Sequence, residues 1–170
     1  TAGNSTPLTD GAAAVLLASE DWAKAHNLSV QAWLRYGKVA AVDFVKKEGL
    51  LLAPAYAVSA MLADAGLGLA DFDLYEIHEA FAAQTLATLK AWESPEFCRD
   101  KLGRSQPLGP VDRTRLNSRG GSIAIGHPFA ATGARILGTL ARELELRGSG
   151  RGLISICTAG GMGVTAIVER

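Results

Sequence analysis

The sequence predicts an α/β fold in which helices cover a mixed, mostly parallel sheet that ends in an antiparallel hairpin. Short apolar runs bounded by Gly, Asp or charged residues alternate with longer segments of helical character, the pattern of a helix-covered sheet. Only residues 158–162 separate the last two apolar runs. A crossover connection needs more residues than that, so these two strands should pair as a hairpin.

The strands are predicted from apolar runs short enough to be buried within a sheet. In chain order they are Ala12–Ala18, Val39–Val42, Leu74–Ile77, Ser122–Ile125, Leu153–Cys157 and Gly163–Glu169.

Helices are predicted between these strands, at residues 20–26, 54–65, 79–92 and 132–147. Pro54 suits a first helical turn, and Gly66 and Gly148 suit positions just past a helix end. In the last helix, apolar residues from Ile136 to Leu144 recur on one face. The stretch from Ser94 to Arg119 is rich in charge, Pro and Gly, and we expect a long excursion that could cover a site or contact a partner.

The composition indicates one main domain with a balanced surface. The chain has 170 residues, 48% of them hydrophobic, and 17 basic residues balance 17 acidic ones. Without an excess of either sign, nucleic acid and anionic membranes are not expected partners, which leaves small molecules or other proteins. The sequence contains no apolar run of membrane-spanning length. Cys98 and Cys157 form no C-x-x-C pair, so we expect neither a disulfide framework nor a zinc site. Two unpaired cysteines fit a reducing compartment, and we expect a cytoplasmic location.

Three segments place reactive side chains at predicted strand ends, where the ligands of open α/β sheets generally bind. The first is Ile77–Phe81, in which His78 joins a strand to a helix. Such a histidine can donate a hydrogen bond or hold a water against developing negative charge. The alternative is a capping or core histidine without chemistry.

The second segment is Gly120–Pro128, with glycines flanking a short apolar run and His127 before a proline. The glycines let the backbone approach a ligand closely, and the proline restricts the turn, so His127 is a candidate general base. Alternatively, the glycines serve tight packing alone. The spacing matches neither a phosphate loop nor a dinucleotide fingerprint.

The third segment is Cys157–Gly163, where a cysteine ends a strand and a glycine-rich turn exposes backbone N–H groups. A thiol of lowered pKa can move protons, and exposed amides can form an oxyanion hole. A buried, inert cysteine before a hairpin turn is the alternative.

Taken together, these blocks resemble the three C-terminal signature blocks of the thiolase family, in the same order and spacing. Thr1–Asn4 and Asp10–Ala13 resemble the segment that joins the two halves of a thiolase. The resemblance implies that residues 1–27 end the N-terminal half and its connection, and that residues 28–170 form the C-terminal thiolase domain. Because the sequence begins without Met, we expect a segment of a longer polypeptide.

The resemblance also implies roles for the reactive residues. His127 would deprotonate a nucleophilic cysteine that belongs to the first thiolase half and is not in this chain. Cys157 would act as acid or base on the acyl carbon being joined or released. His78, where many thiolases have Asn, would hold the water of one oxyanion hole, and the backbone amide near Ala159 would contribute to a second.

By the same resemblance, the chain is part of an acyl-CoA C-acyltransferase and is inactive alone. The substrates would be 3-ketoacyl-CoA and CoA, with no tightly bound cofactor and no metal. The enzyme would be a 3-ketoacyl-CoA thiolase of fatty-acid β-oxidation or an acetyl-CoA acetyltransferase. The His-Glu-Ala-Phe motif is similar to that of the β-subunit of the fatty-acid-oxidation trifunctional enzyme, which favours degradative thiolysis of longer 3-ketoacyl chains. The partners implied are an N-terminal thiolase half, a second copy in a homo-oligomer and a hydratase/dehydrogenase subunit. A non-catalytic thiolase-like module that binds acyl-CoA or lipid is the alternative.

Two positions depart from the family pattern. Ala130 follows Gly-His-Pro-Phe where the family usually has Gly, and Ala159 stands where many members have Gly. The extra methyl group matters if the backbone there adopts positive φ or touches a ligand.

Overall fold

A four-stranded sheet of order β1-β4-β3-β2 forms the centre of the computed structural model, which describes residues 1–170. Its strands are β1 (Trp33–Ala41), β2 (Leu74–Ile77), β3 (Arg151–Thr158) and β4 (Met162–Glu169). The mixed α/β class is confirmed, and so is the antiparallel hairpin of β3 and β4. The expectation of a mostly parallel sheet is wrong, because only β2 and β3 run parallel. β1 adds antiparallel to β4 at the edge.

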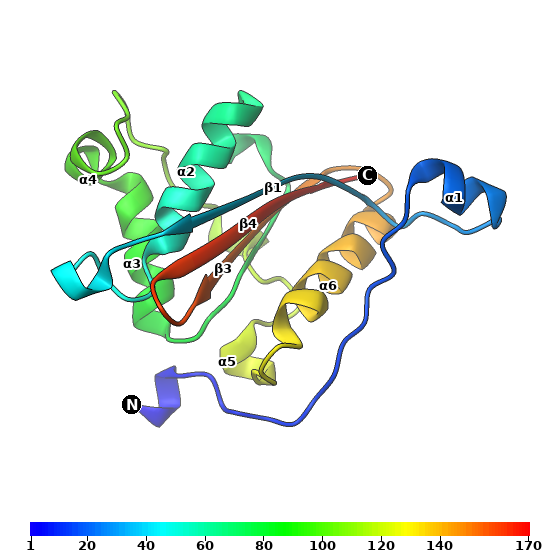
Figure 1. Ribbon diagram of the computed structural model, residues 1–170, viewed down its shortest axis with the longest axis horizontal. Helices are drawn as coiled ribbons and strands as arrows, with labels where there is room; N and C mark the ends of the chain where they lie inside the picture. The colour runs from blue at the N-terminus through cyan, green and yellow to red at the C-terminus, as the bar shows by residue number, and fades with distance from the viewer.

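Helices cover both faces of this sheet (Figure 1). The α-helices of the chain are α1 (Glu20–Ala25), α2 (Ala53–Ala65), α3 (Ala82–Glu93), α4 (Pro95–Asp100), α5 (Ser122–Ile125) and α6 (Thr132–Arg147). Of these, α2 and α3 pack on one face of the sheet and α6 packs on the other. The helices predicted from the sequence are confirmed, although α3 starts at Ala82 rather than at residue 79. Pro54 lies in the first turn of α2, and Gly66 and Gly148 end α2 and α6 with left-handed backbones. No helix combines the length and the apolar character that crossing a membrane requires.

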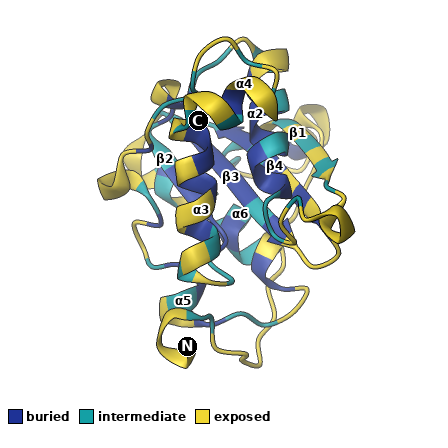
Figure 2. Cartoon of the chain, turned by 90° about the vertical axis from the view of Figure 1, so that its left-hand side faces the viewer, coloured by how far each residue is buried: buried dark blue, intermediate teal, exposed yellow.

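Two hydrophobic cores lie on opposite faces of the sheet, and Figure 2 shows the burial concentrated there. The larger core packs α2 and α3 against the sheet around Trp92, Phe72 and Met61. The smaller one packs α6 against β3 and β4. Tyr75 and Ile77 of β2 face the larger core, so the alternation of side chains directs Glu76 toward α6. The α6 face of the sheet therefore carries polar groups beside a small apolar core.

Residues 122–125 were expected to form a strand and instead form the single-turn helix α5. The carbonyl of Gly121 accepts hydrogen bonds from the backbone N–H groups of Ala124 and Ile125. The Glu79 carboxylate accepts one from Ile123 N at 3.2 Å, which satisfies a free N–H at the start of the helix. An apolar run this short fits either structure by pattern, and these local hydrogen bonds decide for the helix.

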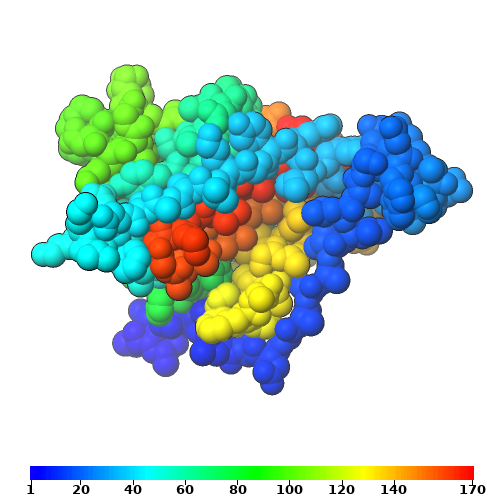
Figure 3. Space-filling model, viewed as in Figure 1, coloured from blue at the N-terminus to red at the C-terminus, as the bar shows by residue number.

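Residues 12–18, also predicted as a strand, pair with no strand in this structure. They belong to an extended segment, residues 5–19, that Figures 1 and 3 show running over the surface past α5 and α6. Leu16 is 71% exposed and Leu17 is 64% exposed. The predicted division between residues 27 and 28 falls in the coil between α1 and β1, and it stays a prediction.

The excursion from Ser94 to Arg119 is more ordered than its composition indicates. Ser94 caps α4 by accepting a hydrogen bond from Phe97 N at 3.1 Å, and Cys98 is completely buried. Arg104 donates from Nε to Ser59 Oγ of α2 at 2.7 Å. The segment thus packs against α2 and α3.

Candidate active site

The two predicted histidines meet at the end of β2. His78 continues the parallel pairing of β2 with β3 by donating its backbone N–H to the carbonyl of Ser155 at 2.9 Å. His127 follows α5, and its backbone N–H donates to the carbonyl of Pro7 at 3.0 Å. The ring centroids of His78 and His127 lie 4.3 Å apart. Residues that are distant in sequence therefore form one imidazole pair.

Each imidazole has a hydroxyl partner. His78 Nδ1 lies 2.9 Å from Ser122 Oγ, and His127 Nδ1 lies 2.6 Å from Thr132 Oγ1. Both rings are thereby oriented through Nδ1 and keep Nε2 for another partner. Neither hydroxyl was singled out in the sequence, although Ser122 directly follows the glycine pair and Thr132 opens the helix after His127.

Both histidines are held in the neutral form. Burial, the neighbouring His127 and the Arg135 guanidinium lower the pKa of His78 to about 4. Burial and Arg135 also lower the pKa of His127. A neutral imidazole has one N–H donor and one acceptor nitrogen, so near pH 7 each ring can accept or donate a proton according to its tautomer.

Cys157 lies near the end of β3 and is a buried, free thiol. Burial raises the pKa of this thiol to about 11, against the opposing effect of the backbone N–H groups of Cys157 and Ala80. The contact with Ala80 places the sulfur beside the loop that follows His78. Cys157 is therefore protonated at neutral pH, which suits a proton donor, whereas the sequence argument had looked for a lowered pKa.

Ala159 occupies the exposed turn between β3 and β4, two residues beyond Cys157. Gly160 (φ 90°) and Gly161 (φ 76°) supply the left-handed conformations of this turn, and Ala159 is not among the residues with positive φ. The methyl group of Ala159 therefore introduces no backbone strain.

Glu79 and Asn117 fix the loop that carries His78. Asn117 Oδ1 accepts a hydrogen bond from Ile77 N at 2.8 Å, and its Nδ2 donates to Glu79 Oε1 at 2.6 Å. A Cβ atom at Gly121 would lie 2.1 Å from Glu79 Oε2, so the glycine makes room for the carboxylate. Sequence reasoning missed Asn117, whose only signal was a polar residue three positions before the glycine pair.

The segment Ser5–Gly11 joins the loops of both histidines. Thr6 N donates to the carbonyl of Ala80 at 3.0 Å, and Thr6 Oγ1 donates to the carbonyl of Ser122 at 2.7 Å. Together with the hydrogen bond from His127 to Pro7, these contacts tie three separate parts of the chain together. An open cavity of about 350 Å³ lies where this segment meets His127; it is lined by Leu8, Thr9, Asp10, Gly11, His127, Pro128 and Phe129.

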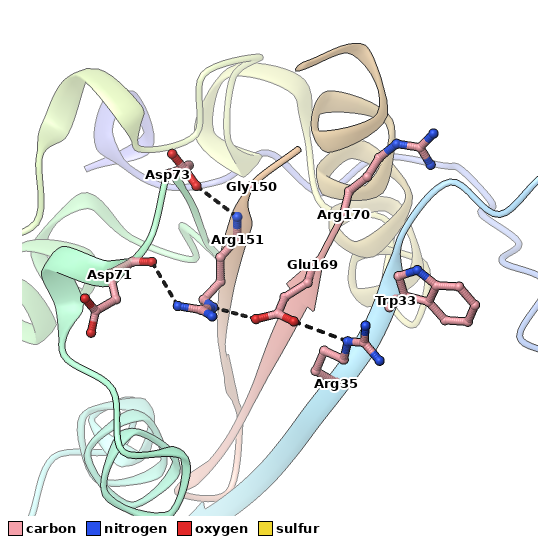
Figure 4. A pocket seen from close by; sticks show the side chains of 8 residues that line it. All are labelled: Trp33, Arg35, Asp71, Asp73, Gly150, Arg151, Glu169 and Arg170. Carbon is pink, nitrogen blue, oxygen red and sulfur yellow. Dashed lines mark hydrogen bonds and ion pairs between the residues drawn. The ribbon is translucent and has the colours of Figure 1, made fainter. Parts of the chain in front are cut away.

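A second, larger cavity of about 470 Å³ lies at the other end of the sheet (Figure 4). Its charges satisfy one another: Arg151 Nε pairs with Glu169 at 2.6 Å, and Arg35 pairs with the same carboxylate at 3.2 Å. The Arg151 backbone N–H donates to Asp73 at 2.9 Å. None of the three predicted side chains lies here, and no cluster of three or more His, Cys, Asp or Glu residues in the structure could hold a metal ion.

Ala130 is predicted to destabilise the protein where it stands. Its φ of 65° is left-handed, which costs a residue with a Cβ atom about 1 kcal/mol. Ala130→Gly should therefore raise the free energy of unfolding by about 1 kcal/mol in denaturant titrations. The matched control, Ala159→Gly, should give no gain, because φ at Ala159 is not positive. Equal effects of the two substitutions would contradict this explanation.

The fold and the site define an α/β domain whose acid–base groups gather at the carboxyl ends of its parallel strands. The chain belongs to the thiolase family: the family model described as "Thiolase, C-terminal domain" matches residues 29–170.

Known proteins are similar over almost the whole chain. The 3-ketoacyl-CoA thiolase of Serratia proteamaculans (strain 568) is 54% identical over 169 residues, which are 99% of this chain and 38% of that protein. The dimeric peroxisomal thiolase of Saccharomyces cerevisiae superimposes with a TM-score of 0.79 at 38% identity, covering 99% of this chain and 37% of that one. Human mitochondrial 3-ketoacyl-CoA thiolase in complex with CoA gives 0.75 at 36% identity, covering 99% and 38%. The chain thus spans well under half the length of these relatives.

Proposed function

We propose that this chain is the C-terminal part of an acyl-CoA C-acyltransferase of the 3-ketoacyl-CoA thiolase type, with 3-ketoacyl-CoA and CoA as substrates. The observation that carries the proposal is the pair of neutral imidazoles, 4.3 Å apart, at the same sheet edge as the protonated thiol of Cys157. The names of the relatives, among them a thiolase in complex with CoA, support the substrate class.

In the proposed reaction, His127 accepts the proton of a nucleophilic cysteine contributed by a thiolase N-terminal half. The thiolate attacks the 3-keto carbon, and the bond between the second and third carbons breaks. The electron pair leaves as the enolate of acetyl-CoA, whose carbon takes the proton of the Cys157 thiol. CoA then attacks the acyl-cysteine, and its thiol proton restores Cys157. The bond between the acyl carbon and the cysteine sulfur breaks, acyl-CoA leaves, and the released thiolate takes back its proton from His127.

The protonation states fit these roles. A thiol whose pKa is raised to about 11 keeps its proton until a more basic carbanion forms beside it. A neutral His78 offers an N–H group to an oxyanion or to the water that holds it. The exposed turn at Ala159 is the proposed source of a second oxyanion hole. We assign no tightly bound cofactor and no metal to the reaction.

The exposed, extended segment of residues 12–18 supports the proposal that another part of a thiolase assembly covers it. Apolar side chains such as Leu16 and Leu17 are exposed over consecutive positions, as at surfaces that another part of a protein covers. The proposed assembly therefore includes an N-terminal thiolase half and a second copy of the protein, as in the dimeric yeast relative. The proposal also includes a hydratase/dehydrogenase partner, a role in β-oxidation and a cytoplasmic location. The free thiols of Cys98 and Cys157 fit the reducing compartment that this location implies.

The test is to assay thiolysis by the 170-residue chain alone and by the chain joined to a thiolase N-terminal half. Acetoacetyl-CoA and a long-chain 3-ketoacyl-CoA serve as substrates, and the joined protein with its nucleophilic cysteine changed to Ser is the control. We expect activity only from the joined protein with the intact cysteine. Robust activity of the chain alone would show that no outside cysteine is required. Binding of acyl-CoA without turnover by the joined protein would favour the non-catalytic module.

A further inference from the structure

Arg135 of α6 reaches the site through a single buried hydroxyl. Ser122 Oγ lies 3.0 Å from Arg135 Nη2 and 2.9 Å from His78 Nδ1, and Ser122 is completely buried. These are the only two hydrogen-bond partners of that hydroxyl in the structure. Arg135, Ser122 and His78 thus form a chain of hydrogen bonds that ends on the imidazole.

The direction of this chain follows from counting donors and acceptors. A guanidinium group has donors only, so Ser122 Oγ must accept from Arg135. A serine hydroxyl has one proton, and the remaining partner of this one is His78 Nδ1. If His78 instead donated from Nδ1, the buried Ser122 proton would have no acceptor, an arrangement that folded proteins avoid.

The hydroxyl of Thr132 beside His127 lets the ring proton lie on Nδ1, the opposite nitrogen to that of His78. Thr132 Oγ1 donates to the backbone carbonyl of Pro128 at 3.4 Å. That carbonyl is an acceptor for the hydroxyl proton, so in the 2.6 Å contact with His127 Nδ1 the imidazole N–H can be the donor. His127 then carries its lone pair on Nε2, as a general base must.

We propose that Arg135, acting through Ser122, is a positioning residue that fixes His78 in the tautomer with the proton on Nε2. With the Thr132 proton donated to the carbonyl of Pro128, the two neighbouring imidazoles have opposite tautomers: His78 presents an N–H donor and His127 presents a lone pair. The catalytic meaning of this difference rests on the proposed function, whereas the tautomers themselves do not. Neither the fold nor the motif distinguishes the two rings in this way.

The surroundings of Arg135 fit a residue retained for its charge and donors. Its Nε and Nη1 atoms are buried without a hydrogen-bond partner, an unfavourable arrangement for packing alone. The acidic group near Arg135 is Glu76 of β2, and burial raises the pKa of its carboxyl to about 7. Arg135 lowers this pKa, whereas the charges of Glu79 and Glu143 raise it further. The guanidinium group has N–H donors and no acceptor, so its role toward Ser122 is that of a donor.

The decisive measurement is the ¹⁵N NMR spectrum of the His78 side chain in the chain joined to a thiolase N-terminal half. The His78 signals are assigned by their loss in His78→Asn. We expect one tautomer, protonated at Nε2, throughout neutral pH. In Arg135→Met, Ser122 becomes free to accept from Nδ1–H, so both tautomers should appear. Arg135→Lys keeps a donor and should restore the single tautomer.

The control is Arg142→Met, which removes an exposed arginine of the same helix that pairs with Glu145; it should leave His78 unchanged. A ring that spends about half its time in the other tautomer loses about half of its competent population, so kcat of Arg135→Met should fall about twofold or more with little change in KM. A wild-type ring protonated at Nδ1, or a single Nε2 tautomer in Arg135→Met, would overturn the proposal. A wild-type ring protonated at Nδ1 would overturn the proposal even if Arg135→Met did not fold, and Arg135→Lys then tests the role of the donor. Because NMR needs no turnover, an inactive protein with the expected tautomer would contradict only the proposed function.

Discussion

His127→Ala is expected to lower thiolysis by the joined protein by roughly 10²- to 10⁴-fold, the usual effect of removing a general base. Nδ1 of the His127 imidazole is held by Thr132 at 2.6 Å, which leaves Nε2 for the proposed proton transfer from the nucleophile. Without it, the nucleophilic cysteine should remain a thiol at neutral pH. The measurement is the rate of alkylation by iodoacetamide as a function of pH, together with steady-state thiolysis.

The matched control is His26→Ala. His26 is exposed at the end of α1, where it stacks on Trp22 with 3.9 Å between the ring centroids. Its loss should change neither alkylation nor thiolysis. If alkylation of His127→Ala at neutral pH were as fast as in the wild type, His127 would lose the role of base.

Gly163→Ala should reduce the free energy of unfolding by about 3 kcal/mol, the upper part of the usual range for overpacked sites. A Cβ atom at Gly163 of β4 would lie 2.5 Å from Pro54 N and 2.7 Å from Ala53 C. Those atoms are backbone at the start of α2 and cannot rotate away. β4 and α2 would have to separate, and their contact forms part of the larger core.

Gly37→Ala is the matched control, because Gly37 lies on the neighbouring strand β1 and its nearest atom to an added Cβ is Thr165 O at 3.9 Å. Its unfolding free energy should change by less than about 0.5 kcal/mol. Chemical denaturation of both variants gives the comparison. Equal losses of unfolding free energy in the two variants would mean that the close approach of α2 to β4 does not account for the effect of Gly163→Ala.

The parts of the fold that sequence reasoning located are those determined by neighbouring residues. Pro54, Gly66 and Gly148 mark helix ends because each has a restricted or permissive backbone, and the structure places them there. The hairpin of β3 and β4 followed from a connection too short for anything else. In contrast, the direction of β1 depends on which sheet edge it joins, and no local pattern encodes that choice.

The candidate site shows the same division. The motifs identified His78, His127 and Cys157, yet the hydroxyls that orient the two imidazoles come from α5 and α6, and α5 was expected to be a strand. Ala130 and Ala159 looked alike as departures from the family pattern. Only the backbone angles separate them, with Ala130 alone in the left-handed region.

The contacts of Ser5–Gly11 place part of the site outside the region that the family model matches, residues 29–170. Thr6 and Pro7 hold the backbone beside both imidazoles from the N-terminal side of that region. If a domain exchange between thiolases cut the chain at residue 29, the whole sheet would be transferred. The segment that holds the backbone beside its two histidines would then come from the other protein. A recombined segment that keeps these hydrogen bonds therefore has to include Thr6 and Pro7, well before the first strand of the sheet.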